Sequence, residues 1–244
     1  MKDFIIHKAG SRGHAENEWL SSYQTFSFSK YYHPERIQFG ALRVLNDDTV
    51  AGGKGFGSHP HDNMEIISIP LEGALEHRDN LGNTGIIRKG DIQVMTTGTG
   101  VFHSEVNADP EQPVKFLQIW IFPKQLNVKP RYEQITLDRV HQVNQLQQIV
   151  SPYPEEEGCQ INQDAWFSMG TFERSKTARY NARITNNGLY FFVINGSFKI
   201  EGQKLDSRDG MGIPECGPVN IESLEDNSTI LIMDIPMKAD QQNM

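Results

Sequence analysis

Cysteine is scarce in this chain, and neither a long apolar run nor an excess of positive charge is present. Only Cys159 and Cys216 occur in 244 residues, and no CxxC pair exists, so neither a zinc site built from cysteines nor a disulfide framework is expected. No apolar run approaches the roughly 20 residues of a membrane span, and the opening MKDFIIHKAGSR lacks the long apolar core of a signal peptide. We therefore expect a cytoplasmic protein with reduced thiols and no membrane contact.

The net charge is −8 at pH 7, so the chain offers no basic surface of the kind that binds nucleic acid. Direct binding of nucleic acid is not expected. Hydrophobic residues make up 37% of the chain, and its length suffices for one large or two small β domains, each with its own core.

Histidine is confined to the first part of the chain. All eight histidines precede residue 142, and none follows. A metal site made of imidazoles therefore cannot form within the second half. The eight are His7, His14, His33, His59, His61, His77, His103 and His141.

Two short motifs carry the donors of a metal site. His59 and His61 form one pair, and His103 and Glu105 form another; residues i and i+2 of a β-strand project from the same face, so each pair presents two donors to one side of a sheet. Three imidazoles and one carboxylate suit Fe(II), Zn, Ni, Co or Cu(II), whereas Mg and Ca prefer shells of oxygen. An isolated HxH pair is more often an ordinary surface feature, but two pairs at strand spacing favour one shared metal ion.

Glycines around these motifs resemble the two sequence boxes of the cupin β-barrels. The first box, G(x)5HxH(x)3,4E(x)6G, is matched by Gly53, His59, His61 and Glu65, and its closing Gly73 is one residue late. The second box, G(x)5PxG(x)2H(x)3N, is looser, because a threonine stands in the proline position and two extra residues precede the histidine. Its matching residues are Gly90, Gly98, His103 and Asn107.

Longer strings of the sequence closely resemble the pirin family, especially its bacterial quercetinase-like members. These are GSHPHDNMEIISIPLEGALEHRD, GDIQVMTTGTGVFHSE, LQIWIFP and TFSFSKYYHPERIQFGALRVLNDD. The likeness is dense from about residue 8 to 135 and thinner beyond. It implies an all-β bicupin, with two jelly-roll-like cupin β-barrels and short helices. In pirins the metal ligands are the histidines of HPH and the His and Glu of HSE, which map onto His59, His61, His103 and Glu105 without substitution.

Glu65 and His77 are further candidates near the motifs. Glu65 has the same parity as His61 and competes with Glu105 for the carboxylate position, but the resemblance favours Glu105. We therefore expect Glu65 to accept a hydrogen bond from a ligand imidazole and fix its tautomer, the alternative being a buried, paired acid. His77 could share the inward parity, yet it follows the Gly73 turn, and a hydrogen-bonded hairpin residue is the favoured interpretation.

The two halves of the chain look like diverged copies of one unit. IPLEGALEH followed by IIRKGDIQVM resembles VINGSFKIE followed by KLDSRDGMGIP. We expect residues 1–140 to form a metal-binding cupin domain and residues 155–244 a metal-free one, linked by SPYPEEEG. Apolar residues from Leu137 to Val150 repeat near the helical period, so either a helix or a connecting segment is expected there. Strands are predicted at 39–45, 66–71, 85–95, 116–122, 166–171, 188–194, 197–200 and 230–235.

The resemblance also implies an activity. It predicts a metal-dependent dioxygenase that opens a flavonol such as quercetin with O2, so the partners are a small aromatic substrate and dioxygen. The three histidines hold one divalent transition metal, with Fe(II) as the first choice and Zn, Ni, Co or Cu as alternatives, while Glu105 acts as the catalytic residue that takes the substrate proton. The other hypothesis is a metal-binding regulatory protein that acts through protein partners. Metal identity, substrate and oligomeric state stay open.

Overall fold

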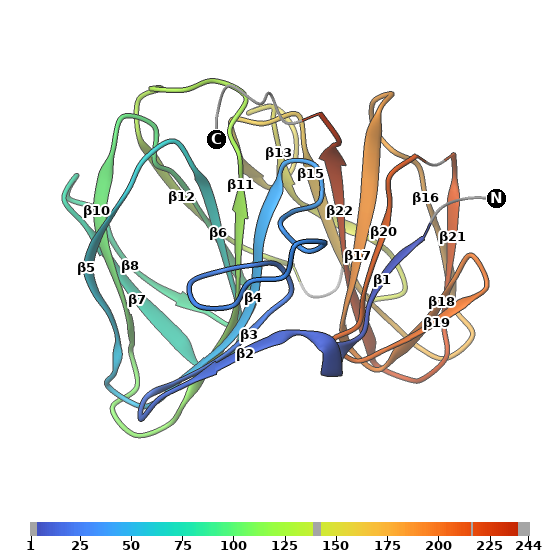
Figure 1. The fold of residues 1–244 in the computed structure, drawn as a ribbon, viewed down its shortest axis with the longest axis horizontal. Coiled ribbons are helices and arrows are strands. Elements are labelled where there is room, and N and C mark those ends of the chain that lie inside the picture. Colours follow the sequence, from blue (N-terminus) through green and yellow to red (C-terminus); the bar gives the residue numbers. More distant parts are fainter. Residues whose placement is uncertain (1–3, 139–142, 216, 239–244) are drawn as a thin grey trace.

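The computed structural model describes residues 4–138, 143–215 and 217–238 and shows an all-β protein built from two cupin units (Figure 1). Each unit consists of a seven-stranded sheet facing a four-stranded sheet. The one helical element within the described ranges is the 3-10 turn η1 (Ala9–Ser11). None of the helical structure described here has the length and apolar character needed to cross a membrane.

The first unit contains the HPH and HSE motifs. Its seven-stranded sheet runs, in spatial order, β12 (Arg131–Thr136), β9 (Asp91–Thr96), β6 (Glu65–Glu72), β11 (Val114–Ile121), β4 (Leu42–Val50), β3 (Leu20–Gln24) and β2 (Gly13–Glu16). Its four-stranded sheet runs β5 (Gly55–His61), β10 (Val101–Asn107), β7 (Ala74–Asp79) and β8 (Thr84–Arg88). Every neighbouring pair of strands in these two sheets is antiparallel.

The second unit repeats this strand order, with one exception in the direction of an edge pair. Its seven-stranded sheet runs β1 (Ile5–His7), β20 (Gly210–Ile213), β17 (Asn187–Asn195), β22 (Ser228–Pro236), β15 (Trp166–Phe172), β13 (Gln147–Ser151) and β14 (Cys159–Gln160). The edge pair β13 and β14 is parallel, where β3 and β2 are antiparallel. Its four-stranded sheet runs β16 (Thr177–Tyr180), β21 (Val219–Ser223), β18 (Ser197–Ile200) and β19 (Gln203–Asp206). The repeat predicted from sequence is therefore present in the strand order, although β1 comes from the opposite end of the chain.

Two glycines occupy equivalent turns in the copies. Gly73 joins β6 to β7 with φ +73°, and Gly196 joins β17 to β18 with φ +74°. Only glycine adopts this left-handed conformation without a steric cost. The sequence match between PLEGA and VINGS thus corresponds to one tight turn used twice.

The two seven-stranded sheets lie next to each other, and the four-stranded sheets lie on the outside (Figure 1). Alternate residues of each strand face the junction, as the period of two requires. Leu117 and Ile119 of β11 and Leu231 and Met233 of β22 belong to one continuous buried cluster that spans both units. The remaining residues of the same strands face the interior of their own unit.

The helix considered for residues 137–150 is wrong for the part that the structure describes. Residues 139–142 lie outside the described residues, Val143 forms a bridge with Thr171, and β13 begins at Gln147. The spacing there reflects burial of Ile149 and Val150 beside the exposed Val143, rather than one face of a helix. The loop after β13 connects it to β14 within the second seven-stranded sheet.

Candidate metal centre

The HPH and HSE motifs lie on the neighbouring strands β5 and β10. His59 stands directly opposite His103, and His61 opposite Val101, in an antiparallel register. The register shifts by one residue between His103 and Glu105, so the ladder is irregular at the site. A β-bulge of this kind redirects a side chain, and such bulges are common beside functional sites.

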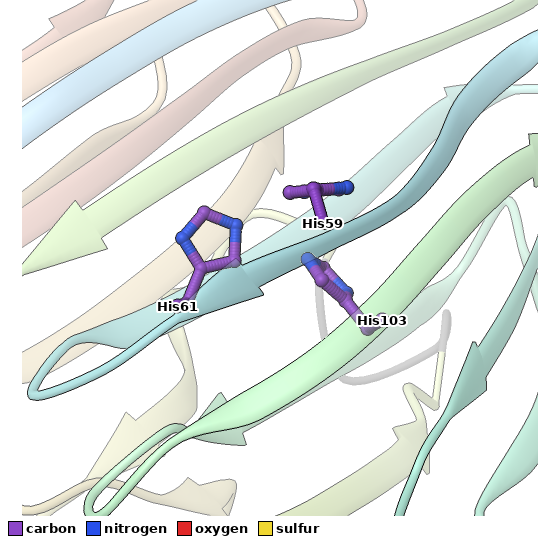
Figure 2. A group of neighbouring side chains, drawn as sticks. All are labelled: His59, His61 and His103. Carbon is purple, nitrogen blue, oxygen red and sulfur yellow. The ribbon is translucent and has the colours of Figure 1, made fainter.

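The three imidazoles converge as the sequence predicts (Figure 2). One ring nitrogen of each of His59, His61 and His103 can be chosen so that all three lie within 4.8 Å of one another. Among the described residues this is the group of three or more potential metal-binding side chains that the structure brings together. Bonds of about 2.0–2.1 Å to one metal keep any two nitrogens within about 4.2 Å of each other, so the rings need only move slightly closer to bind one ion together.

Burial keeps two of the three rings neutral. Burial, helped by the neighbouring imidazoles, lowers the pKa of His61 to about 4 and that of His103 to about 3. A neutral imidazole has a lone pair to donate, so these rings can bind a cation at neutral pH without first losing a proton. The third ring, His59, lies with Nδ1 2.7 Å from the carbonyl oxygen of Gly57. Because a carbonyl only accepts, Nδ1 carries the proton and Nε2 is left as the donor.

Glu105 projects into the unit from β10 and is 1% exposed. Its Oε1 accepts a hydrogen bond from Ser68 Oγ at 3.0 Å, and its Oε2 accepts one from Gln118 Nε2 at 2.6 Å. Gln118 in turn accepts a bond from Trp120 Nε1 at 3.2 Å, and the indole packs edge-on against His61. Glu105 is not part of the three-histidine group, so its carboxylate is held beside that group by two neutral donors.

A continuous row of polar side chains crosses the inner face of the seven-stranded sheet at the level of Glu105. Each member stands opposite the next in the strand register, and five of the six are buried. We call Gln24, Asn46, Gln118, Ser68, Gln93 and Gln134 the polar row. Its buried atoms Gln24 Oε1, Asn46 Oδ1 and Gln93 Nε2 have no hydrogen-bond partner in the protein. Buried polar groups without hydrogen bonds destabilise a folded protein, so the interior beside the polar row is better suited to polar groups than to packed apolar side chains.

Asp48 lies next to the polar row on β4, opposite Ser22 and Phe116. Burial raises its pKa to about 7, although a hydrogen bond from Ser22 opposes the shift. Its Oδ1 also lacks a partner. The polar interior thus includes an acid that is partly protonated near neutral pH.

The role expected for Glu65 is wrong. Its Oε2 accepts hydrogen bonds from Thr96 Oγ1 at 2.7 Å and from the backbone N–H of Asn162 at 3.1 Å, and neither partner is an imidazole. Glu65 shares its strand face with Ile67, which belongs to the cluster between the units. Burial raises the pKa of Glu65 to about 7. The residue is the buried, hydrogen-bonded acid that was the alternative interpretation.

His77 is the hydrogen-bonded hairpin residue that the sequence favoured, since its Nε2 lies 3.3 Å from Asp79 Oδ2 on the β7–β8 hairpin, and it also faces inward. It is fully buried on β7, opposite Glu105 in the register, and its ring lies 5.3 Å from that of His103 and 4.7 Å from that of Tyr132. The alternation Leu75, His77 along β7 was the signal that could have placed it inside, since Leu75 belongs to the core. The unit therefore contains four inward histidines, not three.

The second unit receives one histidine through β1. His7 is buried and its Nδ1 lies 2.7 Å from the hydroxyl of Tyr190. Burial lowers the pKa of His7 to about 4, with Arg36 and His33 adding to the effect. The residue is used in packing and hydrogen bonding, and it does not belong to the metal-binding group.

Two hollows lie away from the histidines. A cavity of about 490 Å³ between the units is lined by residues that include Ile69, Met169 and Arg208. Another of about 700 Å³ lies at loop residues 181–187 of the second unit. Neither includes a member of the histidine group, so ring convergence and chemistry, rather than cavity size, identify the metal centre.

Comparison with known proteins agrees with this geometry. Residues 6–121 match the family model Pirin, and residues 148–235 match the model Quercetinase C-terminal cupin domain. A quercetin 2,3-dioxygenase of Escherichia coli (strain K12) is 36% identical over 231 residues, which cover 95% of this chain and 98% of the relative. A pirin-like protein of Caulobacter vibrioides is 35% identical over 221 residues, 90% of this chain and 94% of that protein.

A solved structure adds a metal to the comparison. The bacterial pirin YhhW from Escherichia coli in complex with nickel(II) superposes with a TM-score of 0.90 at 35% identity, covering 96% of this chain and 99% of that one. That nickel complex and the three converging imidazoles here support one transition-metal ion. The two cupin units share one strand order, and the histidine group lies on β5 and β10. The Escherichia coli quercetin 2,3-dioxygenase is 36% identical over 95% of this chain. The chain therefore belongs to the pirin family.

Proposed function

We propose that the protein is a metal-dependent dioxygenase of the quercetinase type, which opens a flavonol such as quercetin with O2. The observation that carries the proposal is the convergence of His59, His61 and His103 beside a buried carboxylate, in a chain 36% identical to a quercetin 2,3-dioxygenase. Fe(II) is our first choice of metal, with Zn, Ni, Co and Cu as alternatives. When bound, the metal would polarise a substrate oxygen and bring O2 beside it.

Each side chain has a defined part in this proposal. The three histidines hold the metal, with Nε2 of His59 as the donor, because its Nδ1 is engaged by Gly57. Glu105 is assigned as the fourth ligand and as the group that takes the proton of the substrate hydroxyl. Ser68 and Gln118 orient its carboxylate from the opposite sheet. Trp120 packs on His61 and on Phe28, and this aromatic cover limits the access of water.

Two further expectations belong to the proposal. We assign residues 1–140 to the metal-binding domain and residues 155–244 to the metal-free one. Strands β1 and β13 lie outside the range 155–244 but pair with strands of the second unit. The cytoplasm is the proposed location, and neither nucleic acid nor a membrane is proposed as a partner.

The test is oxygen uptake by protein prepared without air and reloaded separately with each of these metals. Quercetin should stimulate O2 consumption and carbon monoxide release with at least one metal. Glu105→Gln should lower the rate by about 100-fold or more, because an amide is a poor proton acceptor. Glu222→Gln, on the corresponding strand β21 of the second unit, is the matched control and should leave the rate unchanged. If no flavonol stimulates O2 uptake with any metal, the regulatory hypothesis becomes the better one.

A further inference from the structure

We infer that His77 and Asp79 position the metal ligand His103: Asp79 fixes the tautomer of His77, whose Nδ1 then accepts a hydrogen bond from the ring nitrogen of His103 that does not bind the metal. The inference rests on the metal-binding part of the proposed function and does not depend on the substrate. It concerns two residues outside the HPH and HSE ligand motifs. Both lie on β7, the strand next to β10.

Asp79 is held in place by hydrogen bonds other than its contact with His77. Its Oδ1 accepts hydrogen bonds from the backbone N–H groups of Leu81 at 3.0 Å and Asn83 at 2.9 Å, and its Oδ2 accepts one from Asn83 Nδ2 at 2.8 Å. Burial alone would raise the pKa of Asp79, but the hydrogen bonds from Asn83, His77 and Leu81 lower it. The carboxylate is therefore ionised and fixed in direction.

An ionised carboxylate can only accept, and this decides the tautomer of His77. Asp79 Oδ2 lies 3.3 Å from His77 Nε2, so Nε2 carries the proton and Nδ1 keeps its lone pair. Nδ1 is buried and has no partner in the protein. The hydroxyl of Tyr132, which packs on the His77 ring, donates instead to Gln134 at 2.9 Å. Tyr132 therefore does not donate a hydrogen bond to the lone pair on His77 Nδ1.

His103 is the ligand that needs such an acceptor. Metal-binding histidines nearly always donate their second N–H to a carboxylate, a carbonyl or water. His59 does so through Gly57, whereas both ring nitrogens of His103 are buried without a hydrogen-bond partner in the protein. An unpaired N–H at this depth would be costly.

The ring geometry fits a bond between the two histidines. Their ring centres are 5.3 Å apart, with the planes inclined by 49°. An N–H···N hydrogen bond of about 3 Å places the centres of two imidazoles about 5 Å apart. The strand register puts Asp79 opposite His103 and His77 opposite Glu105, so His77 and His103 are diagonal neighbours on β7 and β10, and the proposed bond forms when their rings turn toward each other.

The inference is tested by metal affinity in two variants of His77. His77→Phe keeps a flat ring against Tyr132 but removes the acceptor, and it should weaken Ni(II) or Zn(II) binding by about 10–100-fold in a chelator competition assay. His77→Asn keeps an oxygen close to the position of Nδ1 and should restore most of that affinity. Stoichiometry should remain one ion per chain in both. Wild-type affinity in His77→Phe would overturn the inference.

A second measurement uses the unaltered protein and so does not depend on how the variants fold. In the Zn(II)-loaded protein with 15N-labelled histidine, NMR should show His77 protonated at Nε2 and a scalar coupling between His77 and His103 across the hydrogen bond. A His77 protonated at Nδ1, or the absence of that coupling, would contradict the inference while leaving the three-histidine site intact. A protein that binds no transition metal would instead contradict the proposed function itself.

Discussion

The two units share a backbone plan but differ in what faces their interiors. In the first, Ser68 stands five residues before the turn glycine Gly73, and in the second, Phe191 stands five before Gly196. Following the strand register outward from Phe191 gives the counterpart of the polar row. Its members are Gln148, Ser168, Ile232, Phe191, Met211 and Ile6. Four consecutive polar side chains of the first unit, Gln118, Ser68, Gln93 and Gln134, are replaced by apolar ones.

The facing four-stranded sheets differ in the same way. Val219 stands opposite Tyr180 where His103 stands opposite His59, and Ile221 stands opposite Ile200 where Glu105 stands opposite His77. In the second unit these side chains belong to one buried hydrophobic cluster.

The difference teaches that the metal centre is a property of one layer of inward side chains and not of the fold. Apolar burial stabilises the second interior by roughly 25 cal/mol per Å², whereas buried polar groups without partners destabilise the first. The first unit therefore gains less free energy from apolar burial at the level of the site than the second unit gains at the equivalent level. The two units also share one buried core.

The largest expected effect is on metal content. One transition-metal ion per chain should be bound, and His61→Ala should abolish stoichiometric binding because it removes one of three converging nitrogens. Elemental analysis of both proteins is the measurement. His14→Ala, at an exposed histidine outside the site, is the control and should keep the full equivalent. Two ions per chain, or an anomalous signal in the second unit, would remove the contrast between the units.

The ligand pairs could be predicted from sequence because their geometry is local. A spacing of two residues on a strand fixes which side chains share a face, and the HxH and HxE motifs need nothing more. Ser68 and Gln118 could not be found this way, and the alternation of Leu75 and His77 indicates an inward side chain without giving its neighbours. Their contacts with Glu105 and His103 depend on the register between strands that lie 13 to 37 residues apart in sequence.

The error on Glu65 has a specific cause. Its parity was counted from His61 as if one strand continued, but β5 ends at His61 and β6 begins at Glu65, with Asn63 at φ +46° between them. A turn resets which face a given parity occupies. The pairing of β1 with the second unit was missed for a related reason, since no local pattern specifies a partner about 200 residues away.

A smaller effect, expected in stability, concerns Asp48. The corresponding position in the second unit is Gly170, since Asp48 pairs with Phe116 and Gly170 with Ile230 in equivalent ladders. The pKa of Asp48 is about 7 in the folded protein and near 3.8 when unfolded. Between these values the folded chain holds a proton that the unfolded chain has released, so the contribution of Asp48 to stability is full below pH 3.8 and is lost as pH rises toward 7.

The size of that change is about 4 kcal/mol, because each pKa unit corresponds to about 1.4 kcal/mol. Urea unfolding of the metal-free protein at several pH values should show this loss, and Asp48→Asn should remove it. Glu65, whose pKa is also raised to about 7, is present in both proteins, so the difference between their pH profiles isolates Asp48. Parallel profiles would mean that Asp48 is ionised in the fold at neutral pH.

The smallest expected effect is a difference between two matched turns, Gly73 and Gly196. Alanine at either position would adopt a left-handed backbone conformation, which costs about 1–2 kcal/mol. At Gly73 the new Cβ would meet Pro113 O and Val114 Cα at 3.2 Å, a contact that small shifts can relieve. At Gly196 it would lie 2.7 Å from Cβ of the buried Ser228, whose hydroxyl accepts from Ser197 N and donates to Glu225 O.

Gly196→Ala should therefore lower the free energy of unfolding by about 1–2 kcal/mol more than Gly73→Ala, since it also disturbs two hydrogen bonds. Urea unfolding of the metal-free variants measures this difference. Equal losses would show that the second unit yields at its turn as readily as the first, despite its apolar interior.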